Sequence, residues 1–255
     1  MKEIIKSSST RIKTGLALIA AVLFIGYIDS FFLMWILFGG LLVVAISESQ
    51  RLYKTEIDSI YLYTGALLFA AYFYPNPEDL IFVVAVVYAS VLAYTRNLDK
   101  KIFLPLLYPT ASFLFLLTLY IEYGVMSLLW LLVIVAGADI GAYFVGRGMG
   151  KTKFCETSPN KTLEGVVGGL IVASLFGVFF AIDNISTFGA IVISLVVALA
   201  SVFGDLFESY LKREAGVKDS GDILPGHGGI LDRTDGYLFG GIIMLVLLRA
   251  ILWFY

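Results

Sequence analysis

Charged residues are scarce in this sequence. They make up 15% of the 255 residues, whereas ordinary soluble domains carry about 25%, and the mean hydropathy is +0.90. A soluble globule needs a charged surface, so this class is excluded. Cysteine occurs once, as Cys155, which excludes an intramolecular disulfide. Histidine also occurs once, as His227, and neither residue has an evident third partner for a catalytic triad.

Long apolar runs take the place of the missing charge. A membrane span needs about 20 mostly apolar residues, and β-barrel strands would alternate over about 10 residues instead of running continuously. We therefore predict an all-α, polytopic integral membrane protein with about nine transmembrane helices. The predicted spans cover roughly residues 15–28, 31–46, 59–74, 80–95, 102–121, 124–145, 165–182, 185–208 and 235–255. We expect the first to be an uncleaved span and not a removable signal.

Basic residues are distributed on one side of this arrangement. With nine spans, 17 of the 18 Lys and Arg residues fall on the side of the N-terminus, and the exception, Arg249, lies inside the last span. The charged residues of the opposite loops are all acidic, namely Asp29, Glu78, Asp79, Glu122 and Asp183. Because positively charged loops stay in the cytoplasm, we predict a cytoplasmic N-terminus.

Polar and flexible residues concentrate in the second half of the chain. Of the 25 glycines, 19 fall from Gly137 onward. We predict a transmembrane scaffold of about five helices over 1–122. A catalytic transmembrane region with cytoplasmic loops at 147–164 and 209–234 would follow over 123–255. The pairs Gly137/Gly141, Gly165/Gly169 and Gly236/Gly240 are each spaced by four, which indicates close helix packing.

Acidic residues occur at the edges of two predicted spans. A charged carboxylate costs about 2.5–3.5 kcal/mol at a helix centre, so Asp139 needs a partner or a task. It could also lie at the water interface or pair with Arg147. Asp205, Glu208 and Ser209 share one helix face, and Lys212 continues that face. For Glu208 and Lys212 the alternative is an amphipathic helix end that emerges into water.

The run "KDSGDILPGHGGILDRTDG", residues 218–236, concentrates polar residues in a largely apolar chain. It holds four aspartates, Asp219, Asp222, Asp232 and Asp235, among glycines and basic residues. Mg²⁺ is commonly bound by one or two carboxylates plus phosphates, and glycine-rich turns bring backbone N–H groups close to anions. The stretch therefore predicts a metal and phosphate site, with a solvated surface loop as the alternative.

The loop "GRGMGKTKFCETSPNK" contains a glycine–lysine motif without being a P-loop. The P-loop pattern requires glycine where Val145 stands, and a membrane helix precedes the segment instead of a strand. Ser158 is a good helix N-cap and Pro159 suits a first helical position, so we predict a helix start there with Lys161 in its first turn. Such a helix start would attract an anion.

Three segments together resemble one enzyme family. The stretch "SYLKREAGVKDSGDILPGHGGILDRTD", from Ser209 to Asp235, is similar to the signature of the phosphatidate cytidylyltransferases, also called CDP-diacylglycerol synthases. "ADIGAYFVGR" and "SPNKTLEGVVGG" resemble further segments of that family. One departure is Asn160, where the family often has a second basic residue that would contact a phosphate.

This resemblance implies an integral membrane enzyme. The distribution of basic residues predicts that its active site faces the cytoplasm, and the short chain suits the inner (plasma) membrane of a bacterium. Members of the family condense CTP with phosphatidic acid to give CDP-diacylglycerol and pyrophosphate. They depend on Mg²⁺ and have a two-cation centre, in which the second cation would be K⁺ or another Mg²⁺. Carried onto this chain, the cation ligands would be Asp205 and Asp232. The resemblance also implies a homodimer, and nothing in the sequence suggests a nucleic-acid partner.

The expected site residues follow from the motifs and the resemblance. The metal ligands would be Asp205 and Asp232, with Asp219 and Asp235 nearby, and Lys218 and Arg233 complete the expected catalytic set. The expected substrate-binding residues are Asp139, Tyr143, Arg147, Ser158, Lys161, Glu164, Ser209, Lys212, Arg213, His227, Gly228 and Gly229. Basic members of these sets would neutralise phosphates of CTP or of the lipid.

Two other functions are compatible with part of this pattern. A CTP-dependent lipid kinase, such as a polyprenol kinase, would also use CTP, Mg²⁺ and membrane helices. An ion-coupled transporter would use Asp139 and Asp205 as intramembrane ion sites, but transporters often show internal repeats, and none is evident here.

Overall fold

The computed structural model describes residues 15, 20–96, 101, 103–226 and 228–252, and within these ranges it is helical without β-strands. The chain folds into two compact units. Unit 1 comprises Met1–Leu117 and Glu214–Arg233, and unit 2 comprises Thr118–Arg213 and Thr234–Tyr255. The predicted all-helical class is thus confirmed for the described part of the chain.

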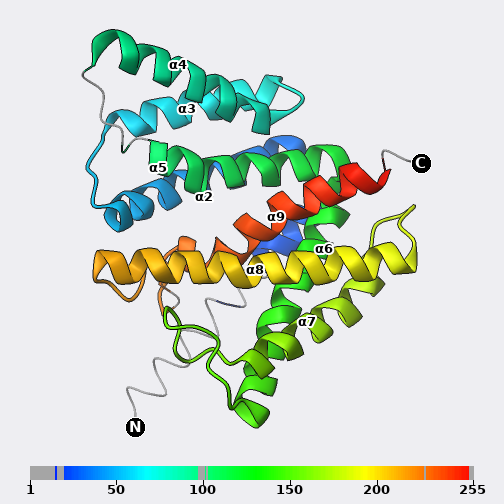
Figure 1. The fold of residues 1–255 in the computed structure, drawn as a ribbon. Helices are drawn as coiled ribbons and strands as arrows, with labels where there is room; N and C mark the ends of the chain where they lie inside the picture. Colours follow the sequence, from blue (N-terminus) through cyan, green and yellow to red (C-terminus); the bar gives the residue numbers. More distant parts are fainter. Residues whose placement is uncertain (1–14, 16–19, 97–100, 102, 227, 253–255) are drawn as a thin grey trace. The chain divides into compact units, whose positions relative to one another are not determined.

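Unit 1 is built around helix α2. Its helical elements are α2 (Phe31–Tyr53), α3 (Ser59–Phe73), η1 (Pro77–Asp79), α4 (Leu80–Thr95), α5 (Phe103–Pro105) and the π-helical turn η3 (Leu106–Ala111). Helix α2 packs against α3, α5 and η3, and α3 packs against α4 (Figure 1). The α2 residues Leu42, Ala45 and Ile46 are fully buried, because the apolar run of this helix is covered by its neighbours.

Unit 2 is formed mainly by four further helices of the described chain. They are α6 (Ser112–Met149), α7 (Leu163–Gly177) with the turn η4 (Val178–Phe180), α8 (Thr187–Ala215) and α9 (Leu231–Leu252), of which α6, α8 and α9 begin or end in unit 1. Small residues let these helices approach closely, as the glycine pairs predict. A Cβ on Gly169 would lie 2.5 Å from the carbonyl oxygen of Ala138, and one on Gly236 would lie 3.1 Å from a methyl of Val135.

Six helical segments of the described chain are long and apolar enough to cross a membrane. They are Phe31–Tyr53, Pro77–Thr95, Phe103–Met149, Leu163–Phe180, Thr187–Ala215 and Leu231–Leu252, with Ser59–Phe73 as a shorter apolar helix. The Phe103–Met149 segment is broken at Gly124, whose φ of 70° interrupts the helix between two predicted spans. A polytopic membrane protein is therefore supported, while nine spans and the orientation of the N-terminus stay predictions.

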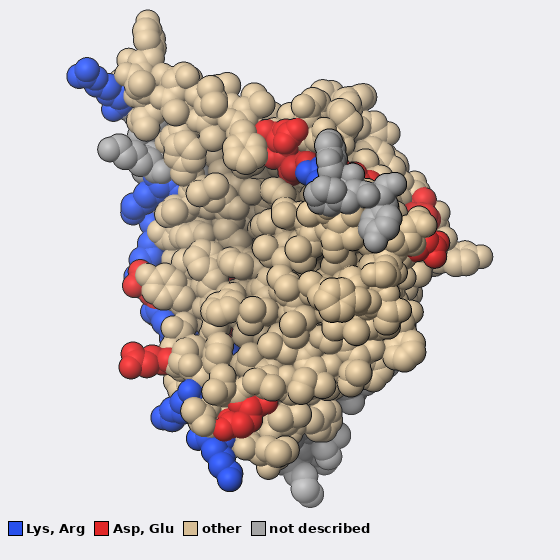
Figure 2. Space-filling view, turned by 45° about the vertical axis from the view of Figure 1, so that its right-hand side comes forward, with Lys and Arg blue, Asp and Glu red and all other residues tan. Residues whose placement is uncertain are grey.

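Much of the exposed surface is apolar. Large side chains such as Tyr94, Phe179 and Leu62 are 92%, 82% and 73% exposed, and on the face shown in Figure 2 most atoms belong to residues other than Lys, Arg, Asp and Glu. Such a surface suits contact with lipid. Within unit 2, Arg249 of α9 donates to both carboxylate oxygens of Glu122, with Nε–O distances of 3.1 and 3.0 Å. This partner compensates the one basic residue inside a predicted span.

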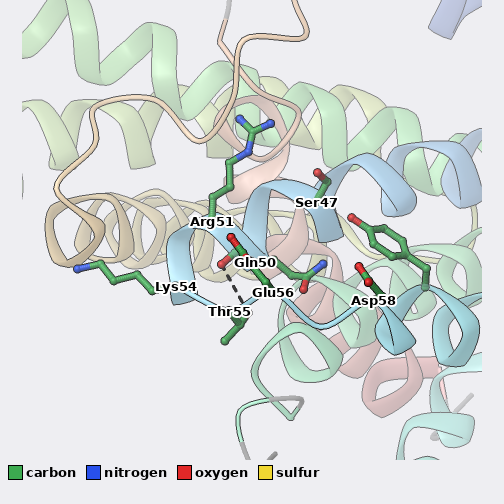
Figure 3. A pocket seen from close by; sticks show the side chains of 8 residues that line it. Ser47, Gln50, Arg51, Lys54, Thr55, Glu56 and Asp58 are labelled. Atoms are coloured by element: carbon green, nitrogen blue, oxygen red, sulfur yellow. Dashed lines mark hydrogen bonds between the residues drawn. The ribbon is translucent and has the colours of Figure 1, made fainter.

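Unit 1 has an open polar pocket of about 690 Å³ where α2 ends (Figure 3). It is lined by Ser47, Gln50, Arg51, Lys54, Thr55, Glu56, Asp58 and Tyr61. Gln50 holds the turn after α2, because the side-chain oxygen of Gln50 accepts from the N–H of Ile57 at 2.6 Å and its carbonyl accepts from the N–H of Thr55 at 2.9 Å.

Candidate active site

The segment that leads into α7 forms a turn where a helix start is predicted. The N–H of Lys161 donates to the carbonyl of Ser158 at 3.0 Å, so Pro159 occupies the second position of a β-turn, which proline favours. Helix α7 begins at Leu163, and the side chain of Thr162 accepts from the N–H of Gly165 at 3.1 Å as the N-cap. The prediction of a helix start at Ser158 is wrong, because Thr162 provides the cap once the turn is complete.

Glu164 fastens the loop that resembles a P-loop. Its carboxylate accepts from the N–H of Lys151 at 3.1 Å, from the N–H of Thr152 at 3.1 and 3.2 Å, and from the Thr152 hydroxyl at 2.9 Å. In a P-loop such backbone N–H groups bind phosphate. A protein carboxylate occupies them here, which agrees with the rejection of the P-loop reading. Glu164 thereby fixes the loop that carries Lys161.

Asp205 on α8 lies at the centre of a polar cluster in unit 2. The Lys161 ammonium is 2.6 Å from Asp205 Oδ2, and the Ser209 hydroxyl donates to Asp205 Oδ1 at 3.2 Å. Both partners of the ion pair are partly accessible, with side-chain exposures of 25% and 34%. The 147–164 loop and α8, which are separate in the sequence, therefore meet at this carboxylate, and the expected residues Lys161, Asp205 and Ser209 form one constellation.

Glu208 continues this cluster into the protein interior. It is fully buried, and the Lys212 ammonium lies 3.5 Å from its carboxylate. The alternative of a solvated helix end is therefore wrong for Glu208, because α8 still packs against neighbours one turn after Asp205. Asp235 of α9 interacts electrostatically with Asp205 and Lys212. The close approach is made possible by Gly204, where a Cβ would lie 2.4 Å from the Asp235 carbonyl oxygen.

The three expected site residues of α6 are exposed. Arg147 donates to the Tyr143 hydroxyl at 2.7 Å, one helical turn away, and its guanidinium also lies 5.9 Å from the Tyr143 ring centroid. Asp139 is exposed near the same end of the helix and interacts electrostatically with Tyr237 of α9. These residues form an accessible polar surface on α6, and their part in substrate binding stays a prediction.

Asp232 lies in unit 1, in the first turn of α9. Its Oδ2 atom accepts from the N–H groups of Ser220 and Gly229, each at 2.8 Å. A carboxylate at a helix N-terminus is also favoured by the helix dipole. The N–H of Gly229 thus binds an anion as the glycine-rich turn predicts, but the anion in this structure is the Asp232 carboxylate.

Glu48, near the end of α2, is a buried acid that sequence reasoning missed. Its side chain is 3% exposed and accepts hydrogen bonds from the glycine-rich loop and from the start of α9, both in unit 1. The signal available in the sequence was a glutamate directly after an apolar run, in "AISESQ". It was passed over because the first 122 residues were interpreted as scaffold.

The predicted loop 209–234 is shorter in the structure, because α8 continues to Ala215 and α9 begins at Leu231, and the remaining expected residues of this stretch are accessible. Arg213, Lys218, Asp219 and Arg233 are exposed, whereas Ser220, Gly229 and Ile230 are buried. The alternative of a wholly solvated loop is therefore excluded, since the loop has a buried inner side and an exposed outer side that carries charges of both signs. His227 lies outside the described residues.

The residues present fit a cation bound together with substrate phosphates. Among the described positions, no group of three or more His, Cys, Asp and Glu side chains is close enough to hold a metal alone. Mg²⁺ commonly takes only one or two protein carboxylates and completes its shell with phosphate oxygens and water. In unit 2 the Lys161 ammonium beside Asp205 shows that this accessible carboxylate accepts a cationic partner.

Comparison with known proteins places the chain in a family. The model of the cytidylyltransferase family matches residues 9–251. A phosphatidate cytidylyltransferase of Helicobacter pylori is 44% identical over 245 residues, which are 95% of this chain and 92% of that protein. One of Thermotoga maritima is 32% identical over 226 residues, 80% and 83% of the two chains, and one of Bacillus subtilis is 47% identical over 122 residues, 46% and 45%. The chain belongs to the cytidylyltransferase family.

Proposed function

We propose that this protein is a phosphatidate cytidylyltransferase, which forms CDP-diacylglycerol and pyrophosphate from CTP and phosphatidic acid. The observation that carries the proposal is the similarity to the Helicobacter pylori enzyme over 95% of the chain. The polar cluster around Asp205 supports it, because a carboxylate, an ammonium and a hydroxyl meet where the apolar part of α8 ends. The ion-coupled transporter receives no comparable support.

The chemistry requires no nucleophilic side chain. An oxygen of the lipid phosphate attacks the α-phosphorus of CTP, the new P–O bond forms, and the bond between the α-phosphorus and the bridging oxygen breaks. Pyrophosphate leaves with that bond's electron pair. The lipid phosphate is already an anion near neutral pH, so the protein must align two anions and neutralise their charge. Lys161 and Lys212, placed beside acids on α8, suit this task.

We propose Asp205 as a ligand of Mg²⁺, with Asp235 as a neighbouring carboxylate in unit 2. Asp232 remains a proposed ligand on the family resemblance, with Asp219 nearby as a further proposed ligand from the acidic run, and the second cation, K⁺ or another Mg²⁺, is proposed on the resemblance as well. When bound, Mg²⁺ neutralises charge on the transferring phosphates. Apart from this, Lys161 would release Asp205 and turn toward a phosphate, and Ser209 would keep the Asp205 carboxylate oriented.

Labelled CTP distinguishes the proposed reaction from a lipid kinase. With purified protein, phosphatidic acid in detergent micelles and Mg²⁺, label from the α-phosphate is expected in the lipid product, because the cytidylyl group is transferred. Label from the γ-phosphate should appear only in pyrophosphate. Lipid labelled from the γ-phosphate alone would instead establish a kinase and overturn the proposal. Flux of ions in proteoliposomes without nucleotide would favour the transporter.

We also propose that the loop between α6 and α7 faces the cytoplasm, as the distribution of basic residues predicts. Cys155 is the only cysteine, lies in this loop and is partly exposed. A membrane-impermeant maleimide is therefore expected to label the protein in inverted membrane vesicles and to leave it unlabelled in intact spheroplasts. The control is a Cys155→Ser variant, which should remain unlabelled in both. Labelling in intact spheroplasts would place the loop on the outer side.

The homodimer implied by the family resemblance is likewise a proposal. Light scattering of the purified protein with a correction for bound detergent should give a protein mass of twice 28.0 kDa. A protein mass of one chain would contradict it.

A further inference from the structure

Glu48 reaches from α2 to a segment more than 170 positions later in the chain. One carboxylate oxygen, Oε1, accepts from the N–H of Ile230 at 2.9 Å. The other, Oε2, accepts from the N–H of Leu231 at 2.8 Å and lies 3.0 Å from the Ser220 hydroxyl. A buried carboxylate is costly unless it is hydrogen-bonded, and these contacts to the loop and to α9 meet that cost.

The contacts of Glu48 act as a cap supplied from another helix. The first N–H groups of an α-helix have no partner inside the helix, and Leu231 is the first residue of α9. Glu48 accepts from this N–H and from that of the preceding residue, Ile230. Within unit 1, Glu48 therefore ties the first residue of α9 to α2. A second contact at the end of α2 holds the beginning of the 214–233 segment, because the Lys54 ammonium donates to the Glu214 carbonyl at 2.8 Å.

Ser220 connects Glu48 with Asp232. Its hydroxyl lies 3.0 Å from Glu48 Oε2 and 3.0 Å from Asp232 Oδ2, so its single hydrogen is given to one carboxylate or to the other. Its N–H donates to Asp232 Oδ2 at 2.8 Å, and its oxygen accepts from the N–H of Asp232 at 3.3 Å. Ser220 therefore contacts both acids, which links the position of Glu48 to that of the Asp232 carboxylate.

The glycines of the loop show how closely it fits around Glu48. A Cβ on Gly221 would lie 2.5 Å from Glu48 Oε1, and a Cβ on Gly229 would lie 2.5 Å from Glu48 Oε2. The loop backbone therefore lies directly against the carboxylate. Glycine at these positions is explained by the space that Glu48 occupies, in addition to the turns of the loop.

We propose that Glu48 is a positioning residue for the cytidylyl transfer: through Ser220 and the N–H groups of Ile230 and Leu231, it holds the 220–232 segment so that Asp232 keeps one orientation. The inference rests on the proposed function for its effect on turnover. Its structural part, the fixing of the 220–232 segment by α2, is independent of which reaction the protein catalyses.

Glu48→Gln is the sharpest test, because it keeps the size of the side chain and replaces one acceptor oxygen by an N–H donor. That donor would face the N–H of Ile230 or of Leu231, since both oxygens of Glu48 accept. We expect kcat to fall about 10- to 100-fold, as for other groups that orient a catalytic residue, with little change in KM for CTP. Hydrogen exchange of the purified full-length protein should become faster in peptides covering 218–233, and unchanged exchange elsewhere would exclude general unfolding.

The matched control is Glu56→Gln, an exposed acid beyond the end of α2 that should keep wild-type exchange and turnover. Glu48→Asp keeps both acceptor oxygens and should recover part of the lost turnover. If Glu48→Gln does not insert, Ser220→Ala, which removes only the shared hydroxyl, should give a smaller loss in the same direction.

Wild-type kcat together with wild-type exchange over 218–233 in Glu48→Gln would overturn the proposal. So would wild-type values of both in Ser220→Ala, if that variant has to be used instead. If the unaltered protein does not transfer the α-phosphate label, the proposed function fails, while the exchange measurement still decides whether Glu48 fixes this segment.

Discussion

Asp205→Asn is expected to reduce cytidylyl transfer by more than about 100-fold while the protein still inserts and folds. Asn has nearly the same shape but no charge, so it would lose both the Lys161 ion pair at 2.6 Å and the proposed Mg²⁺ ligand. Changes in groups that only orient a ligand already cost about 10- to 100-fold, so loss of the ligand itself should cost more. The measurement is incorporation of α-labelled phosphate into lipid by purified protein.

The loss must be separated from an effect of the broken ion pair on folding. Asp183→Asn, an exposed aspartate between η4 and α8 in the same unit, should keep wild-type turnover and serves as the matched control. Lys161→Met breaks the same ion pair but leaves the carboxylate, so it should stay responsive to added Mg²⁺. Near-normal activity of Asp205→Asn would refute the assignment of Asp205 as a metal ligand.

Gly229→Ala should have the second largest effect, on stability and turnover together. The added Cβ would lie 2.3 Å from the Ser220 hydroxyl oxygen, in addition to its overlap with the Glu48 carboxylate. Neither group can move away without losing the hydrogen bonds that hold the start of α9. Overpacking of this kind costs about 1–3 kcal/mol, so we expect a lower Tm in detergent and almost complete loss of transfer.

Gly40→Ala provides the comparison for this variant. Gly40 lies within α2, is exposed, and a Cβ there would meet no atom within 4 Å. Alanine also favours a helix by about 1 kcal/mol over glycine, so Tm should be equal or higher and turnover unchanged. A Gly229→Ala variant that behaves like Gly40→Ala would show that the loop can move away from Glu48, and it would contradict the tight packing described above.

The broad class of the protein was readable from the sequence because it depends on composition and local pattern. Continuous apolar runs with few charges favour helices that cross a membrane, and the helical structure agrees with this. The glycine pairs on α6, α7 and α9 were interpreted as packing contacts, and the approach of Gly169 to the Ala138 carbonyl confirms this. The signature between Ser209 and Asp235 indicated the family, which the match over 9–251 confirms.

The start of α7 shows where a local pattern was insufficient. Ser158 followed by Pro159 is a good helix beginning, and it is also a good turn. A turn forms instead of a helix because of the antiparallel contact between Lys153 and Thr162 and the hydrogen bond from the Thr152 N–H to the Glu164 carboxylate. These contacts join residues from 9 to 12 positions apart. Local helix and turn propensities do not include contacts over such separations.

The sequence by itself determined the membrane environment, the family and the helix face shared by Asp205 and Ser209. Hydropathy, signature residues and helical spacing all depend on residues that are close together in the chain. Only the tertiary structure decided that Lys161 pairs with Asp205, that Glu208 is buried, and that Glu48 caps α9. The Glu48 contact with Ser220 joins residues 172 positions apart. A hydrogen bond between residues so far apart produces no periodic pattern in the sequence. It forms only when the folded chain brings the two residues together.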